Sequence, residues 1–226
     1  METTTIAPTE RSAVQRQKAR GNYEREVIYE ILDEGLVCHV GFVVDGRPFV
    51  IPMGYGRLGD RLILHGSVAS RLIRELAAGI DVCVTVTLLD GLVLARSTFH
   101  HSMNYRSVVA FGRATLITDP AAKSLALDAL VEHLVPGRTR EVRGSSTKEL
   151  AATDVLELPL DEASAKIRVG PPKDAPEDLS ATAWAGVVPL ALTALDPLPS
   201  PDLQPGIAPT DAVRRSQHRG RKTAAW

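Results

Sequence analysis

A short polar segment, residues 65–71, combines residue types that bind a phosphate group. His65 and Gly66 are followed by two serines, Ser67 and Ser70, and by Arg71. The segment follows an apolar run and opens a helical pattern, so N–H groups of a first helical turn would meet the hydroxyls and the guanidinium. Arginine adds charge-assisted, two-point hydrogen bonds. The pattern predicts either a phosphate site or an ordinary capped helix with a surface arginine.

Two adjacent histidines, His100 and His101, stand in a second polar segment, residues 99–107. Neighbouring side chains on a strand point to opposite faces, and no carboxylate or cysteine lies at a useful spacing, so no metal site is expected. Histidine titrates near neutral pH, so either residue could donate a proton or contact a substrate or flavin. Imidazole is also a common axial ligand of haem. An ordinary hydrogen-bonded loop histidine remains the alternative.

Several catalytic motifs are absent from the sequence. No G-x-G-x-x-G follows the first apolar run, and neither a P-loop nor a G-x-S-x-G elbow occurs. Cys38 and Cys83 lie in apolar, strand-like runs and are expected to be buried, reduced thiols. If the protein is an enzyme, a cofactor is therefore expected to supply the chemistry.

The composition limits the classes of partner. The 226 residues have a formal net charge of -1, which gives no general attraction to nucleic acid or to an anionic membrane. No apolar run reaches the roughly 20 residues of a membrane helix. The first 20 residues are polar and lack the apolar stretch of a signal peptide. We expect a cytoplasmic protein with a small-molecule substrate and neither a nucleic-acid nor a membrane partner.

Three zones follow one another along the chain. Residues 1–20 form a flexible polar arm, and residues 21–192 alternate regular elements with short turns. Residues 193–226 form a tail that is first rich in proline and then basic, and it is expected to be extended or disordered. An apolar island, residues 184–192, is expected to dock back on the body.

The regular elements within the body are mostly strands. Helices are expected at residues 23–34, 70–78 and 120–134, the last with Asp119 as its N-cap. Strands are expected at residues 36–44, 49–55, 61–65, 81–89, 92–97, 105–118, 155–160 and 165–169. Hairpin signals at Asp45-Gly46, Gly59-Asp60 and Asp90-Gly91 favour antiparallel pairing. Many strands with few helices favour a barrel over a doubly wound parallel sheet.

Five segments, taken in order, carry a family resemblance. They are residues 39–42, 50–55, 64–71, 83–87 and 104–112, which read HVGF, VIPMGY, LHGSVASR, CVTVT and NYRSVVAFG. With these segments, the chain resembles the pyridoxamine 5′-phosphate oxidase-like superfamily of FMN-binding split barrels, and within it the nitroimidazole-resistance-like flavoproteins. The resemblance covers about residues 20–190. It implies a mainly β (α+β) fold, a six-stranded antiparallel split β-barrel with flanking helices, and a homodimer with FMN in the interface.

The resemblance also implies roles for individual residues. One strand would run under the flavin ring and offer it backbone groups: Val50, Ile51, Pro52, Met53, Gly54 and Tyr55. A second group would hold the ribityl chain and phosphate: His65, Gly66, Ser67, Ser70 and Arg71. A third would approach the cofactor from the long strand and the C-terminal part: Arg106, Ser107, Lys166, Arg168 and Trp184. For Trp184, packing of the returning tail is the alternative.

Some features of the vitamin B6 oxidases are missing. Their Arg-Lys pair is replaced by Arg71-Leu72, and their C-terminal tryptophan signature is not visible, which argues against pyridoxamine 5′-phosphate as substrate. The leading hypothesis is an FMN-dependent oxidoreductase that takes electrons from a reduced nicotinamide or a partner reductase. The acceptor would be a nitroaromatic, a quinone or dioxygen. The alternatives are a deazaflavin-dependent reductase of the same fold and a non-catalytic flavin- or haem-binding protein.

Overall fold

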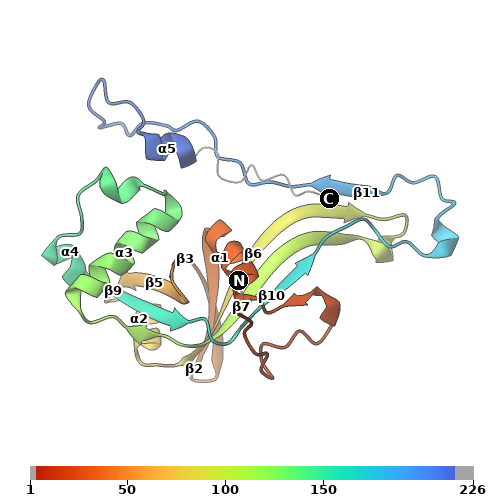
Figure 1. Ribbon diagram of the computed structural model, residues 1–226, viewed down its shortest axis with the longest axis horizontal. Coiled ribbons are helices and arrows are strands. Elements are labelled where there is room, and N and C mark those ends of the chain that lie inside the picture. Colours follow the sequence, from red (N-terminus) through yellow and green to blue (C-terminus); the bar gives the residue numbers. More distant parts are fainter. Residues whose placement is uncertain (1–3, 217–226) are drawn as a thin grey trace.

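Two antiparallel β-sheets pack against each other and enclose the core (Figure 1). The computed structural model describes residues 4–216. The larger sheet has the strand order β1-β10-β7-β6-β2-β3, with β11 paired to β6, and the smaller sheet has the order β4-β5-β9-β8. The strands are β1 (Gly21–Asn22), β2 (Val37–Val44), β3 (Arg47–Gly54), β4 (Gly56–Leu58), β5 (Arg61–Ser67), β6 (Asp81–Leu94), β7 (Ser102–Arg113), β8 (Thr115–Leu116), β9 (Thr153–Pro159), β10 (Ala163–Arg168) and β11 (Gly186–Pro189). The α-helices are α1 (Arg25–Glu34), α2 (Arg71–Ala77), α3 (Pro120–Leu134), α4 (Thr147–Ala152) and α5 (Asp211–Ser216).

The chain crosses between the two sheets instead of closing one barrel. Three direct crossings lie at Tyr55 between β3 and β4, at Ala114 between β7 and β8, and at Leu160 after β9, and a fourth runs through α2 between β5 and β6. All three side chains are buried, so each direct crossing is fixed by the core. The predicted antiparallel, mainly β fold with a few helices is confirmed and is consistent with a split barrel, although the strands form two sheets, neither of which closes on itself. A barrel that is split into two sheets leaves edge strands.

The predicted hairpin at Asp90-Gly91 is wrong, because β6 runs through these residues without turning. The strand pairs with β7 along its length, and its register shifts between Leu89 and Gly91. A two-residue type I′ turn needs positive φ at both central residues. That conformation is found at the true hairpin, with φ of 50° at Asp45 and 72° at Gly46, and not at Gly91. The Asp-Gly pair therefore accompanies a β-bulge instead of a turn.

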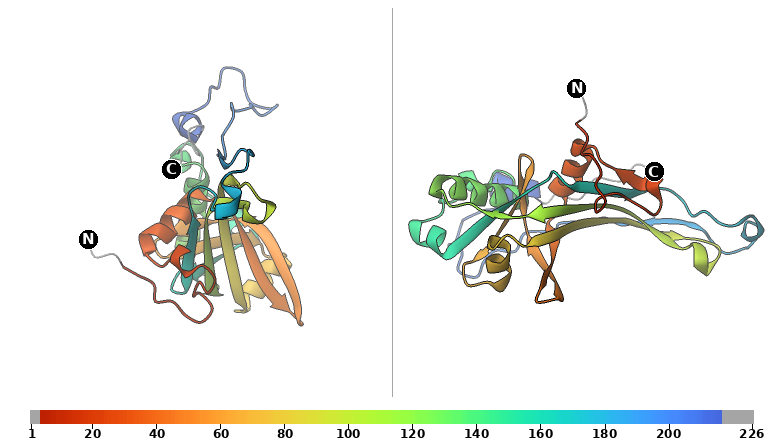
Figure 2. Two further views of the ribbon diagram at one scale, coloured as in Figure 1. Left: turned by 90° about the vertical axis from the view of Figure 1, so that its right-hand side faces the viewer. Right: turned by 90° about the horizontal axis from the view of Figure 1, so that it is seen from below.

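Beyond this bulge the β6–β7 hairpin continues as a projection that we call the arm, residues 91–104 (Figure 1). The right-hand view of Figure 2 also shows the arm projecting at the end of the molecule away from α2. Strand β11 pairs with the arm from Gly91 to Leu94, so the predicted docking of the apolar island is confirmed over these residues. The island docks by adding a strand to the larger sheet.

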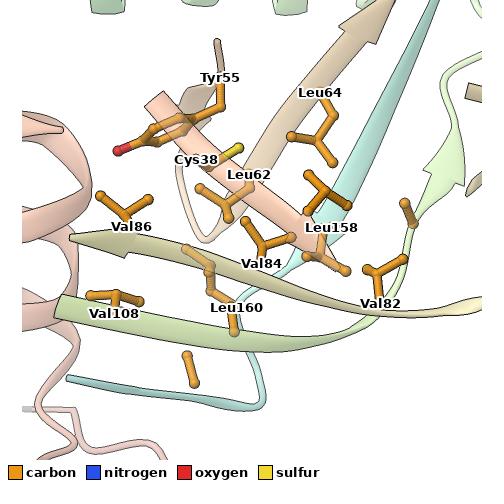
Figure 3. Close-up of a cluster of buried hydrophobic side chains, with 14 of the residues drawn as sticks. Cys38, Tyr55, Leu62, Leu64, Val82, Val84, Val86, Val108, Leu158 and Leu160 are labelled. Carbon is orange, nitrogen blue, oxygen red and sulfur yellow. The ribbon is translucent and has the colours of Figure 1, made fainter. Parts of the chain in front are cut away.

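The core fills the space between the sheets (Figure 3). Alternate residues of β2 and β6 face it, including Cys38, Val40, Val84 and Val86, and the inner face of α1 closes one end. Cys38 and Cys83 are free thiols, and burial raises the pKa of Cys38 to about 12, so this thiol stays protonated at neutral pH. The predicted N-cap of α3 is confirmed, since the Asp119 carboxylate accepts a hydrogen bond from the Ala122 N–H.

Both ends of the described chain contact the body. Ile6 is buried and its N–H donates to the Tyr23 carbonyl, so the N-terminal polar segment, residues 1–20, packs against the body at this point. In the tail, α5 docks through the buried Ala212, and Glu141 accepts hydrogen bonds from Thr210 and from the Ala212 N–H. The basic stretch 214–222 lies mostly outside the described residues. No helix within residues 4–216 is long and apolar enough to cross a membrane.

Candidate functional site

Arg71 is the strongest candidate for an anion-binding residue. It is the first residue of α2, its side chain is exposed, and its guanidinium carbon lies 5.8 Å from the centre of the Phe49 ring. No carboxylate pairs with it within residues 4–216. Because Phe49 belongs to β3, the contact brings the predicted phosphate segment to the predicted flavin strand. The seven-residue α2 has only a small dipole, so the charge of Arg71 carries most of the attraction.

The hydroxyls beside Arg71 are also accessible. Ser70 is the N-cap residue of α2, yet its side chain makes no cap hydrogen bond. The Ser67 hydroxyl accepts a hydrogen bond from the Ala69 N–H, which leaves its own proton to donate. Two hydroxyls and one unpaired guanidinium therefore gather at one corner of the molecule. This arrangement suits a phosphate group.

Strand β3 forms one edge of the larger sheet, with β2 as its neighbour. An edge strand exposes a row of backbone donors and acceptors. The side chains along it are also open to solvent: Val50, Ile51 and Pro52 are exposed, and Met53 and Gly54 are half-buried. Val50 is 65% exposed, which is unusual for a valine in a strand. Residues 50–54 thus have both the apolar surface and the backbone groups that a flat ring system binds.

Tyr55 differs from the other residues of its predicted group. Its side chain is completely buried in the core (Figure 3), and its hydroxyl donates to the Leu32 carbonyl of α1. Its ring also packs on His133, with centres 4.9 Å apart. The side chain of Tyr55 is therefore a core residue that joins α1 to the crossing between the sheets, and it is not available to a ligand.

We expect Tyr55→Phe to lower the free energy of unfolding by about 1–2 kcal/mol, because the change removes a buried hydrogen bond and leaves a carbonyl unpaired. Thermal and urea unfolding measure this loss. Tyr29→Phe is the matched control, since the Tyr29 hydroxyl accepts a hydrogen bond from Arg25 at a half-buried position. Flavin affinity should be unchanged in both variants. A loss of flavin affinity without a loss of stability in Tyr55→Phe would contradict the core role.

His65 and Gly66, predicted to flank the ribityl chain, also contact elements within the chain. His65 lines a cavity of about 280 Å³ with residues of α3 and the loop that follows, including Leu130 and Thr139. Burial lowers the pKa of His65, which favours its neutral form. A Cβ at Gly66 would lie 2.7 Å from the Ile73 side chain, so this glycine lets α2 pack closely on β5.

Arg106 is held by two carboxylates. Its guanidinium donates to both Glu34 oxygens at 2.6 and 2.8 Å, and to both Asp90 oxygens at 2.8 and 3.0 Å. These hydrogen bonds raise the pKa of Arg106, so it stays charged. The pair of bidentate contacts ties the end of α1 to the bulge of β6. Arg106 therefore has no free donor edge for a phosphate, and its position indicates a structural role.

The remaining residues of the third predicted group are spread over the sheet. The Ser107 hydroxyl donates to the Lys166 carbonyl at 3.3 Å, across the β7–β10 pairing. Arg168 is buried and donates to the Asn104 side chain and to the carbonyls of Gly170 and Pro171. Trp184 is 66% exposed and lies at the arm, beside Gly186. None of these residues of the described chain gathers beside Arg71.

The two histidines lie at the tip of the arm, in the turn between β6 and β7. His100 Nδ1 lies 2.9 Å from the Ser97 hydroxyl, and His101 Nδ1 lies 2.9 Å from the Ser97 carbonyl. Phe99, beside them, is 88% exposed. The arm and α2 lie toward opposite ends of the molecule (Figure 1). Within one chain, therefore, the histidines and Arg71 mark two separate places.

One ion pair that anchors the arm tip was not apparent from the sequence. The Asp174 carboxylate accepts hydrogen bonds from the Arg96 N–H at 2.8 Å and from its guanidinium at 2.7 Å. These bonds lower the pKa of Asp174 and keep it charged, and the bond from the Arg96 backbone N–H has the largest effect. The partners are 78 residues apart in the chain. No local signal connects them.

Comparison with known proteins identifies the family. The family model of pyridoxamine 5′-phosphate oxidase matches residues 24–167, which is more than half of the chain. The chain belongs to the pyridoxamine 5′-phosphate oxidase family. The predicted resemblance to this family is thereby confirmed. No curated protein sequence matches the chain.

Two solved structures of this family resemble nearly the whole chain. The flavocytochrome Anf3 from Azotobacter vinelandii is 42% identical, with a TM-score of 0.87, over 92% of this chain and 97% of its own. An FAD- and haem-binding protein from Mycobacterium smegmatis is 44% identical, with a TM-score of 0.85, over 88% and 97%. A candidate 5-nitroimidazole antibiotic resistance protein from Bacteroides thetaiotaomicron is 27% identical, with a TM-score of 0.55, over 65% and 86%.

Proposed function

We propose that this protein is a flavocytochrome, an oxidoreductase that binds one flavin and one haem. The observation that carries the proposal is the extent of the similarity. The match to the flavocytochrome covers 92% of this chain and so extends well beyond residues 24–167 of the family model. The match to the nitroimidazole-resistance-like protein covers 65%. What this chain shares with the haem-binding relatives thus includes sequence outside the common flavoprotein body.

The flavin half of the proposal is supported by β3 and by the corner of α2. The exposed edge of β3, residues 50–54, would hold the ring, and Ser67, Ser70 and Arg71 would hold a phosphate. We expected FMN from the sequence. Because a relative that is 44% identical binds FAD, FAD now becomes the first choice and FMN the second.

The haem half is supported by the tip of the arm. Two histidines stand there beside exposed apolar side chains, among them Phe99 and Met103. Haem is a flat, largely apolar group that needs apolar contacts and an axial ligand. When bound, a flavin supplies hydride and single-electron transfer, and haem iron supplies single-electron and dioxygen chemistry. The electron donor would be a reduced nicotinamide or a partner reductase, and dioxygen, a quinone or a nitroaromatic would be the acceptor.

A homodimer is part of the same proposal. The flavin corner, by which we mean Ser67, Ser70 and Arg71 at the start of α2, and the arm lie toward opposite ends of the molecule (Figure 1). In a two-fold dimer whose axis crosses the middle of this long dimension, the arm of each chain would reach toward the flavin corner of its partner. Light scattering on the purified protein should give twice the mass of 24.3 kDa. A monomer that binds both cofactors would contradict this arrangement.

Titration of the cofactor-free full chain tests the proposed function. Flavin fluorescence and absorbance should report one saturable site per chain, with FAD bound more tightly than FMN. Haemin added to the same protein should give a Soret band that saturates at one haem per chain. Flavin binding without haem binding would contradict the proposed flavocytochrome and leave a flavin-dependent enzyme. Haem binding alone, or neither, would also contradict the proposal.

A further inference from the structure

We propose that His101 is an axial ligand of the haem, and that the arm tip is the haem-binding site. The inference rests on the proposed function, because it assigns a residue to the haem that the protein is proposed to bind. It is carried by the hydrogen bond of His101, by the exposure of its ring, and by the apolar side chains around it.

The hydrogen bond fixes which nitrogen of His101 can bind iron. His101 Nδ1 lies 2.9 Å from the Ser97 carbonyl oxygen, and a carbonyl oxygen can only accept a hydrogen bond. Nδ1 must therefore carry the proton, which leaves Nε2 of the neutral ring with a free lone pair. Metal-binding histidines usually donate their second ring N–H to a backbone carbonyl or a carboxylate in this way. The bond therefore orients the ring and leaves Nε2 facing away from the Ser97 carbonyl.

The Ser97 carbonyl is itself held in position. It also accepts a hydrogen bond from the His100 N–H at 3.3 Å, within a short 3₁₀ turn of residues 98–100. The preceding residue, Arg96, is bound through its backbone and its guanidinium to Asp174, whose side chain is 2% exposed. The bond that orients His101 thus starts from an anchored part of the arm. Such support reduces the reorganisation that ligand binding requires.

The other described histidines lack this combination. His100 Nδ1 meets the Ser97 hydroxyl, which can donate or accept, so that contact leaves the tautomer open. His133 Nε2 lies 2.7 Å from the Gly35 carbonyl, but its ring is half-buried against Tyr55. His65 faces the cavity under α3. His39 is exposed on β2, and no carbonyl fixes its ring. Within residues 4–216, His101 alone is exposed and also has its tautomer fixed by a carbonyl.

The surface around His101 is apolar enough for a porphyrin. Phe99 is 88% exposed, two residues from His101. Met103 is 51% exposed and pairs across the arm with Leu92, which is also exposed. Contiguous exposed apolar surface marks a binding site more often than singly scattered apolar side chains do. These side chains would supply apolar contacts to a haem that His101 binds at the arm tip.

The test compares His101→Ala with His100→Ala, a change of the same type one position earlier in the same turn. The full-length proteins are freed of cofactor and titrated with haemin, and the Soret band is recorded. The wild-type protein and His100→Ala should bind haem with similar affinity. His101→Ala should bind at least tenfold more weakly. For His101→Gly, added imidazole should restore the Soret band. Circular dichroism and flavin affinity, unchanged in all variants, show that the fold is retained.

The outcomes separate this inference from the proposed function. If the wild-type protein gives no Soret band, the haem part of the proposed function fails and the inference fails with it. If the wild-type protein binds haem and His101→Ala binds it equally well, only the inference is overturned. A loss of haem in His100→Ala but not in His101→Ala would also overturn it.

Discussion

Replacing Arg71 with alanine is expected to weaken flavin binding by about 10- to 100-fold. Hydrogen bonds to a charged group contribute about 1.5–3 kcal/mol, and each 1.4 kcal/mol corresponds to a factor of ten in affinity. Arg71 is suited to this contact because its exposed guanidinium stands beside β3 and has no carboxylate partner in the described chain. Fluorescence titration of the cofactor-free protein with FAD and with FMN measures the loss.

Arg74→Ala provides the matched control for this prediction. Arg74 is an exposed arginine one turn further along the same helix, so its removal changes the net charge equally. We expect its effect on flavin affinity to be less than threefold. Arg71→Lys should recover only part of the affinity, because lysine keeps the charge and loses the two-point geometry. Equal losses in the Arg71 and Arg74 variants would mean that general charge, and not a specific contact, attracts the flavin.

Replacing Arg106 with alanine is expected to lower the free energy of unfolding by about 2–3 kcal/mol. The change leaves the carboxylates of Glu34 and Asp90 beside each other without the cation that both now contact. Losing one partner of a buried ion pair costs about 3–5 kcal/mol, and the partial exposure of this cluster reduces that value. Urea unfolding, followed by circular dichroism, measures the difference.

The same variant distinguishes the structural role of Arg106 from the cofactor role that the sequence suggested. Flavin affinity of the folded variant should stay within about threefold of the wild-type value, below the roughly tenfold that one lost charged contact would produce. Arg113→Ala is the control. Arg113 lies on β7, the strand of Arg106, and forms a more exposed ion pair with Asp81 of β6. A variant of Arg106 with normal stability and poor flavin binding would restore the cofactor role.

The sequence predicted most elements of the fold, and the errors have identifiable physical causes. The hairpin at Asp45-Gly46 was predicted correctly, yet the same pair of residue types at positions 90 and 91 lies within a continuous strand. The difference is set by distant partners: β7 pairs on one side of this strand and β11 on the other. The local sequence carries no signal for pairing with strands that are distant along the chain. The short strand β4 and the helix α4 were missed for a related reason, since three to six residues carry little periodicity.

The candidate site was predictable where a residue acts alone and not where it acts with a distant partner. The polar segment alone suggested an anion-binding role for Arg71, which stays a prediction, and the structure adds that its exposed side chain lies beside β3. Arg106 looked equally suited to an anion, but its partner Glu34 lies 72 residues earlier in the sequence. His101 was noticed as one of a pair. Only the carbonyl of Ser97 separates its chemistry from that of His100.

The central claim, that one chain binds both a flavin and a haem, is tested most directly by the absorbance spectrum of the protein as purified. The released cofactors are then identified by mass. We predict flavin bands and a Soret band in the same preparation, with FAD and haem each near one per chain. A protein that carries flavin but shows no Soret band, even after haemin is supplied during expression, would contradict the claim.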